Sequence, residues 1–195
     1  KAQGFTPVAI VGNPGWGETL FLKDVWPDRP LISLCEFYYN GRGSDVGFDP
    51  EFGSGPDALL RARARSSQHL LAIEATDFAY SPTEWQRAQF PTVYRDKIQV
   101  IHDGIDVDVV HPDPDARFAL PDGTTLSRQD EILTYVSRNL EPYRGFHSFM
   151  RAWPAVLEER PNARVVIVGG DDSNTNAAFL AQDLMKYGVQ VIGVP

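Results

Sequence analysis

Seven short apolar runs, rich in Val and Ile, recur along the chain and alternate with longer segments of helical period. The runs are residues 8–12, 31–37, 78–81, 98–102, 132–137, 164–169 and 189–194. Their apolar residues stand at consecutive positions, which is typical of parallel strands that are covered on both faces. The alternation predicts an α/β fold with Rossmann-like parallel sheets and helices on both faces.

Helix signals lie between these runs. Residues 145–159 and 174–187 each place their apolar side chains in one stripe at helical spacing. The Ser-Pro-Thr-Glu sequence at 81–84 predicts a capping box, with Ser81 as the cap and proline at the first helical position. Asp57 is expected to cap a long helix that ends near residue 75.

The chain divides into two predicted α/β units. Residues 103–130 contain several prolines and many aspartates but no helical period. We therefore predict a linker at residues 107–130, which separates a first unit (1–106) from a second (131–195). Glycines and prolines at residues 40–56 predict a long surface loop in the first unit.

Composition limits the partners and the compartment. The formal net charge of −8 argues against nucleic acid, because an acidic chain repels phosphate backbones. The single cysteine, Cys35, allows no internal disulfide, so we expect a cytoplasmic protein in which Cys35 is a packed core thiol. No apolar run approaches the roughly 20 residues that span a bilayer. The scattered histidines predict no metal site.

Two stretches have residue types suited to ligand binding. The Gly-Asn-Pro-Gly-Trp-Gly sequence at 12–17 lies between a strand and a helix, where glycines allow a ligand to approach the backbone. A tight turn with Trp16 as a packing anchor is the structural alternative. Arg138 ends a strand, and Arg144 and Gly145 open the next helix. At the carboxyl edge of a parallel sheet, two such guanidinium groups can converge on a diphosphate, whereas a solvated pair with one arginine bound to Glu141 is the alternative.

These stretches together resemble the retaining GT-B glycosyltransferases of family 4. Pro-Gly-Trp-Gly-Glu (14–18), Glu-Phe-Tyr-Tyr (36–39), Phe-Asp-Pro (48–50), Ser-Pro-Thr-Glu-Trp-Gln (81–86) and Val-Ile-His-Asp-Gly-Ile-Asp (100–106) are similar to the second half of that family's acceptor-side domain. Residues 135–151 resemble the start of its donor-side domain, with Arg144 in place of the usual lysine. The resemblance covers roughly residues 5–168.

The resemblance implies two partial GT-B units and transfer of a sugar from a nucleotide-diphosphate donor with retention of configuration. Arg138, Arg144 and Gly145 would hold the donor diphosphate, and Gly15, Trp16, Gly17 and Glu36 become acceptor-side candidates. No cofactor is required, and no catalytic residue is assigned. The family's glutamate pair, about eight residues apart, does not follow Arg144, so we expect a fragment that is inactive by itself.

The end of the chain has a second resemblance. Gly-Gly-Asp-Asp-Ser-Asn at 169–174 and Val-Ile-Gly-Val-Pro at 191–195 are similar to pyrophosphate-dependent phosphofructokinase. That resemblance implies a phosphate and Mg²⁺ site at Gly169, Gly170, Asp171 and Asp172, in a chimera joined near residues 168–172. The alternative is that Asp171 and Asp172 only cap the following helix.

Three functions therefore remain at this stage. The first is a glycosyltransferase fragment that binds a sugar nucleotide. The second is a catalytically inactive α/β chimera or scaffold, and the third is a phosphate- or pyrophosphate-binding module related to phosphofructokinase. In each case we expect homo-oligomers that form through exposed sheet edges.

Overall fold

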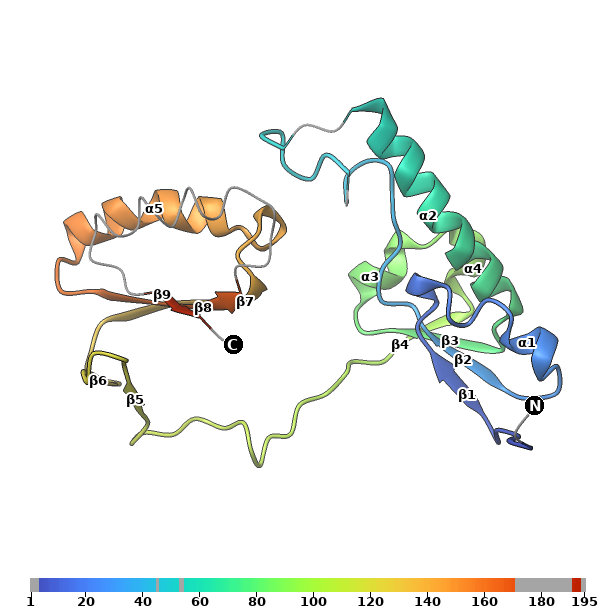
Figure 1. The fold of residues 1–195 in the computed structure, drawn as a ribbon, viewed down its shortest axis with the longest axis horizontal. Coiled ribbons are helices and arrows are strands. Elements are labelled where there is room, and N and C mark those ends of the chain that lie inside the picture. Colours follow the sequence, from blue (N-terminus) through green and yellow to red (C-terminus); the bar gives the residue numbers. More distant parts are fainter. Residues whose placement is uncertain (1–3, 45, 53–54, 171–190, 194–195) are drawn as a thin grey trace. The chain divides into compact units, whose positions relative to one another are not determined.

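The computed structural model describes residues 4–44, 46–52, 55–170 and 191–193. The chain forms two compact units, residues 1–106 and residues 107–195. Each unit has a parallel sheet of its own (Figure 1). Among the described helices, none is long and apolar enough to cross a membrane.

The first unit contains a four-stranded parallel sheet in the order β1-β2-β3-β4. Its strands are β1 (Ile10–Gly12), β2 (Leu31–Leu34), β3 (Phe78–Ser81) and β4 (Ile98–Val100). Its helices are the 3-10 helix η1 (Pro14–Trp16), α1 (Leu22–Val25), α2 (Pro56–Ala75), α3 (Glu84–Gln89) and α4 (Thr92–Arg95). All four strands lie within predicted apolar runs, which confirms the α/β fold class.

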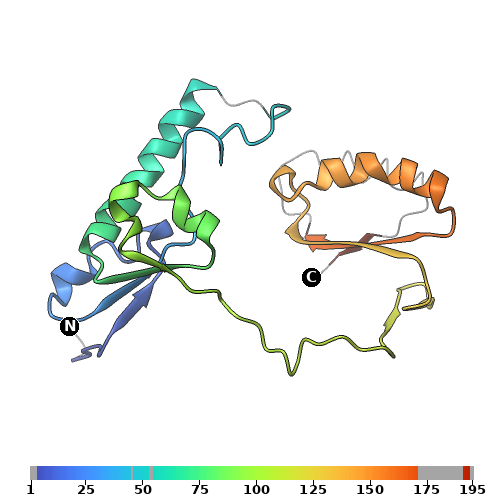
Figure 2. The ribbon, with the colours of Figure 1, turned by 180° about the vertical axis from the view of Figure 1, so that it is seen from behind.

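The strand order explains where the helices of this unit lie. The order of the strands in this sheet is the same as their order along the chain. Because each connection between neighbouring parallel strands is right-handed, the helices of successive connections lie on the same face of the sheet. In both ribbon views α2, α3 and α4 accordingly lie on one side of the sheet (Figures 1 and 2). Ile32 and Phe78, in β2 and β3, are half-buried. The described helices therefore cover one face of this sheet, whereas the sequence predicted both.

The core of the first unit lies between α2 and the sheet. Cys35, Ile73, Ala79 and Phe90 are completely buried there. Burial of a large apolar side chain stabilises a fold by about 1.5–3 kcal/mol. This cluster therefore fixes α2 against the strands.

The helix caps differ from those predicted. Thr83 caps α3, because its Oγ1 accepts the N–H of Gln86 at 3.2 Å. Ser81 is the last residue of β3, where its buried hydroxyl donates to a neighbouring backbone carbonyl. Ser81 is therefore part of the sheet, and the N-cap lies two residues further along the chain, at Thr83. At α2 the N-cap is Gly55, and Asp57 lies in the first turn, where its charge suits the helix dipole.

The second unit has a parallel sheet in the order β7-β8-β9. Its elements are β7 (Ile132–Asn139), the 3-10 helix η2 (Pro142–Arg144), α5 (Phe146–Glu159), β8 (Arg164–Gly170) and β9 (Val191–Gly193). The helix α5 lies along one face of this sheet in both ribbon views (Figures 1 and 2). Leu140, Phe146 and Ile167 form its buried core, against which Tyr135 and Phe149 pack.

The predicted linker at 107–130 contains secondary structure. β5 (Arg117–Ala119) and β6 (Thr125–Ser127) form an antiparallel pair. The turn between them has Gly123 at φ +87°, and Leu120 and Thr124 close it through a 2.7 Å backbone hydrogen bond. A glycine after aspartate is the residue type that such a turn requires. Part of the predicted linker is thus a β-hairpin. The helix predicted at 174–187 lies outside the described residues.

Candidate functional site

The glycine-rich loop after β1 is shaped by Asn13. Its Oδ1 accepts the N–H of Gly15 at 2.8 Å, which caps η1. Gly17 ends η1 with φ +86°, a backbone conformation that side chains other than glycine rarely adopt. A Cβ atom on Gly15 would meet Asn13 Oδ1 at 2.9 Å. Both glycines are therefore required by the turn itself.

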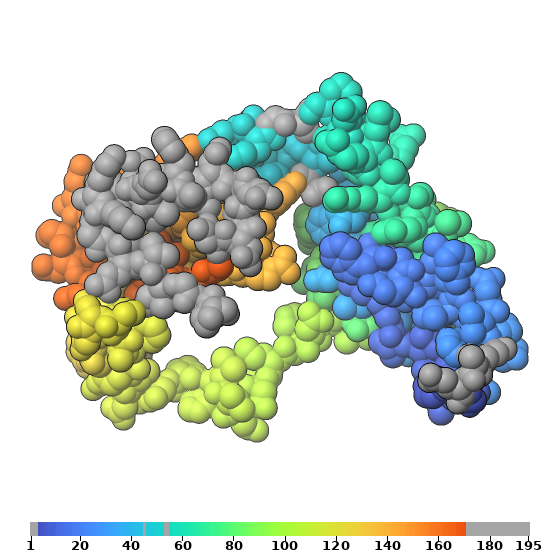
Figure 3. Space-filling view, viewed as in Figure 1, coloured from blue at the N-terminus to red at the C-terminus, as the bar shows by residue number. Residues whose placement is uncertain are grey.

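Two further hydrogen bonds connect this loop to β2 and α2. Asn13 Nδ2 donates to Glu36 Oε2 at 3.1 Å, directly after β2. Gln68 Nε2, on α2, donates to the carbonyl oxygen of Gly15 at 2.7 Å. In the space-filling view the teal atoms of α2 lie against the blue atoms of this region (Figure 3). The structure thus brings the predicted residues Gly15 and Glu36 together through Asn13.

Trp16 is not part of this hydrogen-bond network. Its side chain is 77% exposed, so it is not the packing anchor that the structural alternative required. An exposed indole and an exposed carboxylate, at Trp16 and Glu36, are groups that can contact a sugar, because the ring presents an apolar face and the carboxylate accepts hydroxyl hydrogen bonds. The role of these residues toward an acceptor stays a prediction.

His69 supports the loop from behind. It is 2% exposed on α2, and its Nδ1 lies 3.2 Å from the carbonyl oxygen of Arg65. Its ring contacts Tyr38, Tyr39 and Phe90 in edge-on geometry. Burial lowers the pKa of His69, and the hydrogen bond to Arg65 opposes that shift. The imidazole is therefore a neutral packing group at pH 7.

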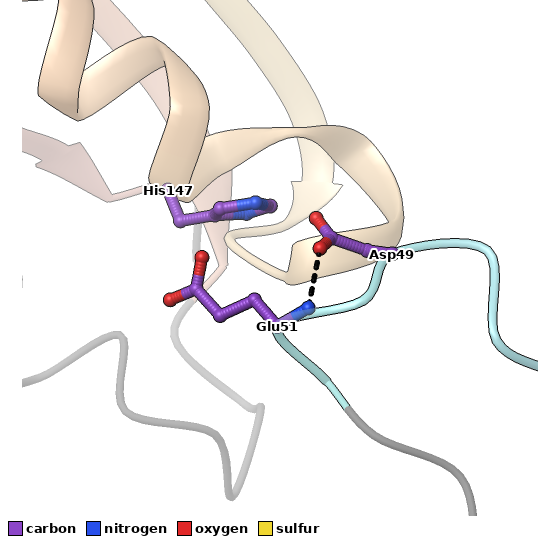
Figure 4. Close-up of side chains that lie close together, drawn as sticks. All are labelled: Asp49, Glu51 and His147. Atoms are coloured by element: carbon purple, nitrogen blue, oxygen red, sulfur yellow. Dashed lines mark hydrogen bonds between the residues drawn. The ribbon is translucent and has the colours of Figure 1, made fainter.

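The loop before α2 holds two acidic residues, Asp49 of the Phe-Asp-Pro sequence and Glu51, and neither was a predicted site residue. Asp49 Oδ1 accepts the backbone N–H of Glu51 at 2.9 Å, and Figure 4 shows this bond as a dashed line. Such a bond between an aspartate and the amide two residues later stabilises a turn.

His147, in the second unit, is buried in the first turn of α5, and its Nε2 lies 3.3 Å from Ser148 Oγ.

Arg138 is exposed at the carboxyl end of β7. The register between β7 and β8 shifts after Val136, because three steps along β7 to Asn139 match two steps along β8 from Val168 to Gly170. A bulge of this kind re-aims the side chains that flank it, and bulges are common beside binding sites. Among the residues that the structure describes, none forms an ion pair with Arg138.

Arg144 lies at the end of η2, before α5. Its Nε is 3.4 Å from Glu141 Oε1, as in the solvated alternative, and its guanidinium group remains half-exposed. The Tyr135 hydroxyl donates to the carbonyl oxygen of Arg144 at 3.0 Å, which fixes the turn against β7. Gly145 follows with φ +72° and links η2 to α5. Both predicted arginines are therefore exposed around one turn that follows β7.

Gly169 has a steric role in β8. A Cβ atom there would lie 2.7 Å from the carbonyl oxygen of Ser137 and 3.0 Å from a methyl group of Leu140. Gly170 accepts the N–H of Leu140 at 3.2 Å. These contacts are part of the pairing of β8 with β7. Asp171 and Asp172, the other residues of the predicted phosphate site, lie outside the described residues.

Comparison with known proteins decides the family. The family model of the glycosyl transferase family 4 group matches residues 1–110, which is more than half of the chain. The chain belongs to the glycosyl transferase family 4 group. The glycine-rich loop, Glu36 and α2 of this family 4 chain all lie within the matched residues.

Solved structures add the fold of the whole family 4 chain. It is similar to a variant of S. aureus TarM in complex with fondaparinux, α-GlcNAc-glycerol and UDP, with a TM-score of 0.57 and 14% identity over 95% of this chain and 33% of TarM. S. aureus MnaA with UDP matches with a TM-score of 0.43 and 11% identity over 96% of this chain and 46% of MnaA. The chain thus spans about a third of the TarM chain. The TarM match shows a fold of the GT-B type.

These matches do not support the phosphofructokinase-like interpretation of residues 166–195, nor a chimera. The family match is to glycosyltransferases, and the TarM match extends over 95% of the family 4 chain. The paired glycines that suggested the phosphate site are explained by strand packing at Gly169.

Proposed function

We propose that this chain binds the nucleoside diphosphate part of a sugar donor in its second unit, as part of an enzyme that transfers the sugar with retention of configuration. Arg138 and Arg144 would hold the diphosphate, and Gly145 would let the backbone turn beside it. The observation that supports this best is the exposed side chain of Arg138, which has no acidic partner among the described residues and stands at the end of β7, directly before the turn that carries Arg144.

The chemistry of sugar transfer explains why arginines would carry this function. As the bond between the sugar and the diphosphate breaks, negative charge develops on the leaving phosphate oxygens. Guanidinium groups already in place stabilise that charge without reorganisation, and their planar forks match two oxygens at once. Glu141 competes for Arg144, so the diphosphate would replace this exposed ion pair, which itself contributes little.

The test is isothermal titration of the chain with UDP, the nucleotide present in the TarM structure, and with GDP. Because a hydrogen bond to a charged group contributes about 1.5–3 kcal/mol, Arg138→Ala and Arg144→Ala should each weaken binding about tenfold or more. Binding that is unchanged in both variants would show that the site is elsewhere.

Arg164→Ala is the matched control. Arg164 opens β8 and is exposed, so its replacement removes the same charge from the amino end of the same sheet. We expect Arg164→Ala to bind UDP within about twofold of wild type, since the exposed charge of Arg164 is at the opposite end of the sheet and is screened by salt. A loss equal to that of Arg138→Ala would indicate a general effect of net charge.

We expect this chain to bind a nucleoside diphosphate but not to transfer a sugar by itself. A chain that folds cooperatively but binds neither UDP nor GDP would favour the inactive scaffold instead.

A further inference from the structure

A cavity of about 1050 Å³ lies in the first unit, between the loop that follows β2 and the helix α2. All the residues that line it belong to the first unit, whereas Arg138 and Arg144 belong to the second. Its volume is at the upper end of the range for small-molecule sites. The residues that line it include an apolar part and a positively charged part.

The apolar part consists of Leu59, Leu60 and Leu70 from α2, together with Tyr38 from the loop, whose ring is largely buried at 9% exposure. Leu60 is 66% exposed, so its side chain is open to a ligand. Tyr38 packs against Phe90, with ring centroids 5.2 Å apart, so its ring is held in place. The leucines therefore supply most of the apolar surface that a ligand can reach without movement of the core.

The charged part consists of Arg42 and Arg63. Among the residues that the structure describes around the cavity, none is acidic, although the chain as a whole has a net charge of −8. Both arginines are exposed, and neither forms an ion pair within the described part of the chain. Two unpaired guanidinium groups at one cavity favour an anion.

The wall of the cavity is rigid at its centre. Ser66 Oγ donates to the carbonyl oxygen of Tyr39 at 2.6 Å, which ties the loop to α2. The Arg65 guanidinium lies 5.2 Å from the centre of the Tyr39 ring, so this arginine is already engaged. Asn40 Nδ2 donates to the carbonyl oxygen of Gln89 at 3.1 Å. A site fixed in this way loses little conformational entropy when a ligand binds.

We propose that this cavity binds an anionic saccharide, in which a sugar ring contacts the leucine surface of α2 and a carboxylate or phosphate binds Arg42 and Arg63. Its role as an acceptor subsite rests on the proposed sugar-transfer function. The apolar C–H face of a pyranose suits an aliphatic wall, while an acidic substituent needs paired guanidinium groups.

The experiment is isothermal titration of the full chain with glucuronic acid, glucose 6-phosphate, glucose and inorganic phosphate. Glucuronic acid and glucose 6-phosphate separate a carboxylate ligand from a phosphate ligand, and glucose is their neutral parent. We expect at least one of the two anionic sugars to bind about tenfold or more tightly than glucose, because charge-assisted hydrogen bonds are the stronger ones. Arg42→Ala and Arg63→Ala should each weaken that binding about five- to tenfold.

Arg61→Ala is the control. Arg61 is exposed on the same helix but does not line the cavity, so its loss should change affinity by less than about twofold. Glucose that binds as tightly as both acids would overturn the proposal, and so would equal losses in Arg61→Ala and Arg63→Ala. Inorganic phosphate that binds as tightly as the better anionic sugar would show a site for the anion alone and would also overturn it.

Titration of the Arg42→Ala, Arg63→Ala double variant with UDP separates this proposal from the one above. The double variant should bind UDP as wild type does, because neither arginine belongs to the second unit. If wild type binds UDP but neither anionic sugar, the cavity assignment is wrong and the donor site stands. If it binds an anionic sugar but no UDP, the donor assignment is wrong and the acceptor role of the cavity falls with it.

Discussion

At the scale of single residues, Cys35 shows how burial controls chemistry. Its thiol is completely buried, and that burial raises its pKa to about 12, although Lys97 acts in the opposite direction. The reactive thiolate is therefore scarce at pH 8. We expect Cys35 to react with a disulfide reagent at least about a hundredfold more slowly in the folded chain than in urea. Equal rates in the two conditions would place the thiol at the surface.

His69 links stability to pH. Its folded pKa is lowered by burial, so the unfolded chain binds more protons between that value and about 6.5. The contribution of neutral His69 is therefore complete above about pH 6.5 and is lost as the pH falls below it. In urea unfolding followed by fluorescence, His69→Phe should lose less stability than wild type between pH 7 and pH 5. Parallel pH profiles for the two chains would contradict this assignment.

The residues of the first-unit loop show which features sequence alone can identify. Gly15, Trp16 and Glu36 stood out through a resemblance, and the structure brings Gly15 and Glu36 together. Asn13 and Gln68, which connect them, gave no signal, because their hydrogen bonds join positions 23 and 53 residues apart. Such long-range contacts follow from the fold and have no local pattern.

At the scale of elements, the pairing of β7 and β8 depends on Gly169. A methyl group there would overlap the carbonyl oxygen of Ser137, and backbone can move only at a cost. We expect Gly169→Ala to lower the free energy of unfolding by about 1–3 kcal/mol in urea titrations. Gly55→Ala is a suitable control, because no atom lies within 4 Å of its Cβ position, and its cost should be below about 1 kcal/mol. Equal losses would remove the steric argument.

Strands were predicted more reliably than turns and caps. Buried strands such as β3 can be recognised by their apolar composition. The predicted bounds of this strand, Phe78 to Ser81, are those of the structure. The β5–β6 hairpin has one buried strand residue, Leu126, and none of the predicted apolar runs, so its clearest signal was the Asp-Gly pair at Gly123. The cap of α3 moved to Thr83 because Ser81 was needed by the sheet, a competition that the local sequence cannot resolve.

At the scale of the whole molecule, the one-sided cover of the first sheet bears on association. Parallel sheets usually have both faces covered, yet Val11 in β1 is 65% exposed and Ile32 is only half-buried. Exposed apolar area and sheet edges favour contact between chains. We therefore expect light scattering to give a mass above the 21.7 kDa of one chain, rising with concentration. A monomer at all concentrations would contradict this expectation.

The most direct test of the account is UDP affinity in the Arg138→Ala, Arg144→Ala double variant. Our central claim is that these two guanidinium groups act on one diphosphate. The double variant should therefore bind UDP about a hundredfold or more weakly than wild type, with unchanged urea unfolding, since each arginine contributes a charge-assisted bond. A double variant that binds UDP as tightly as wild type would contradict the claim.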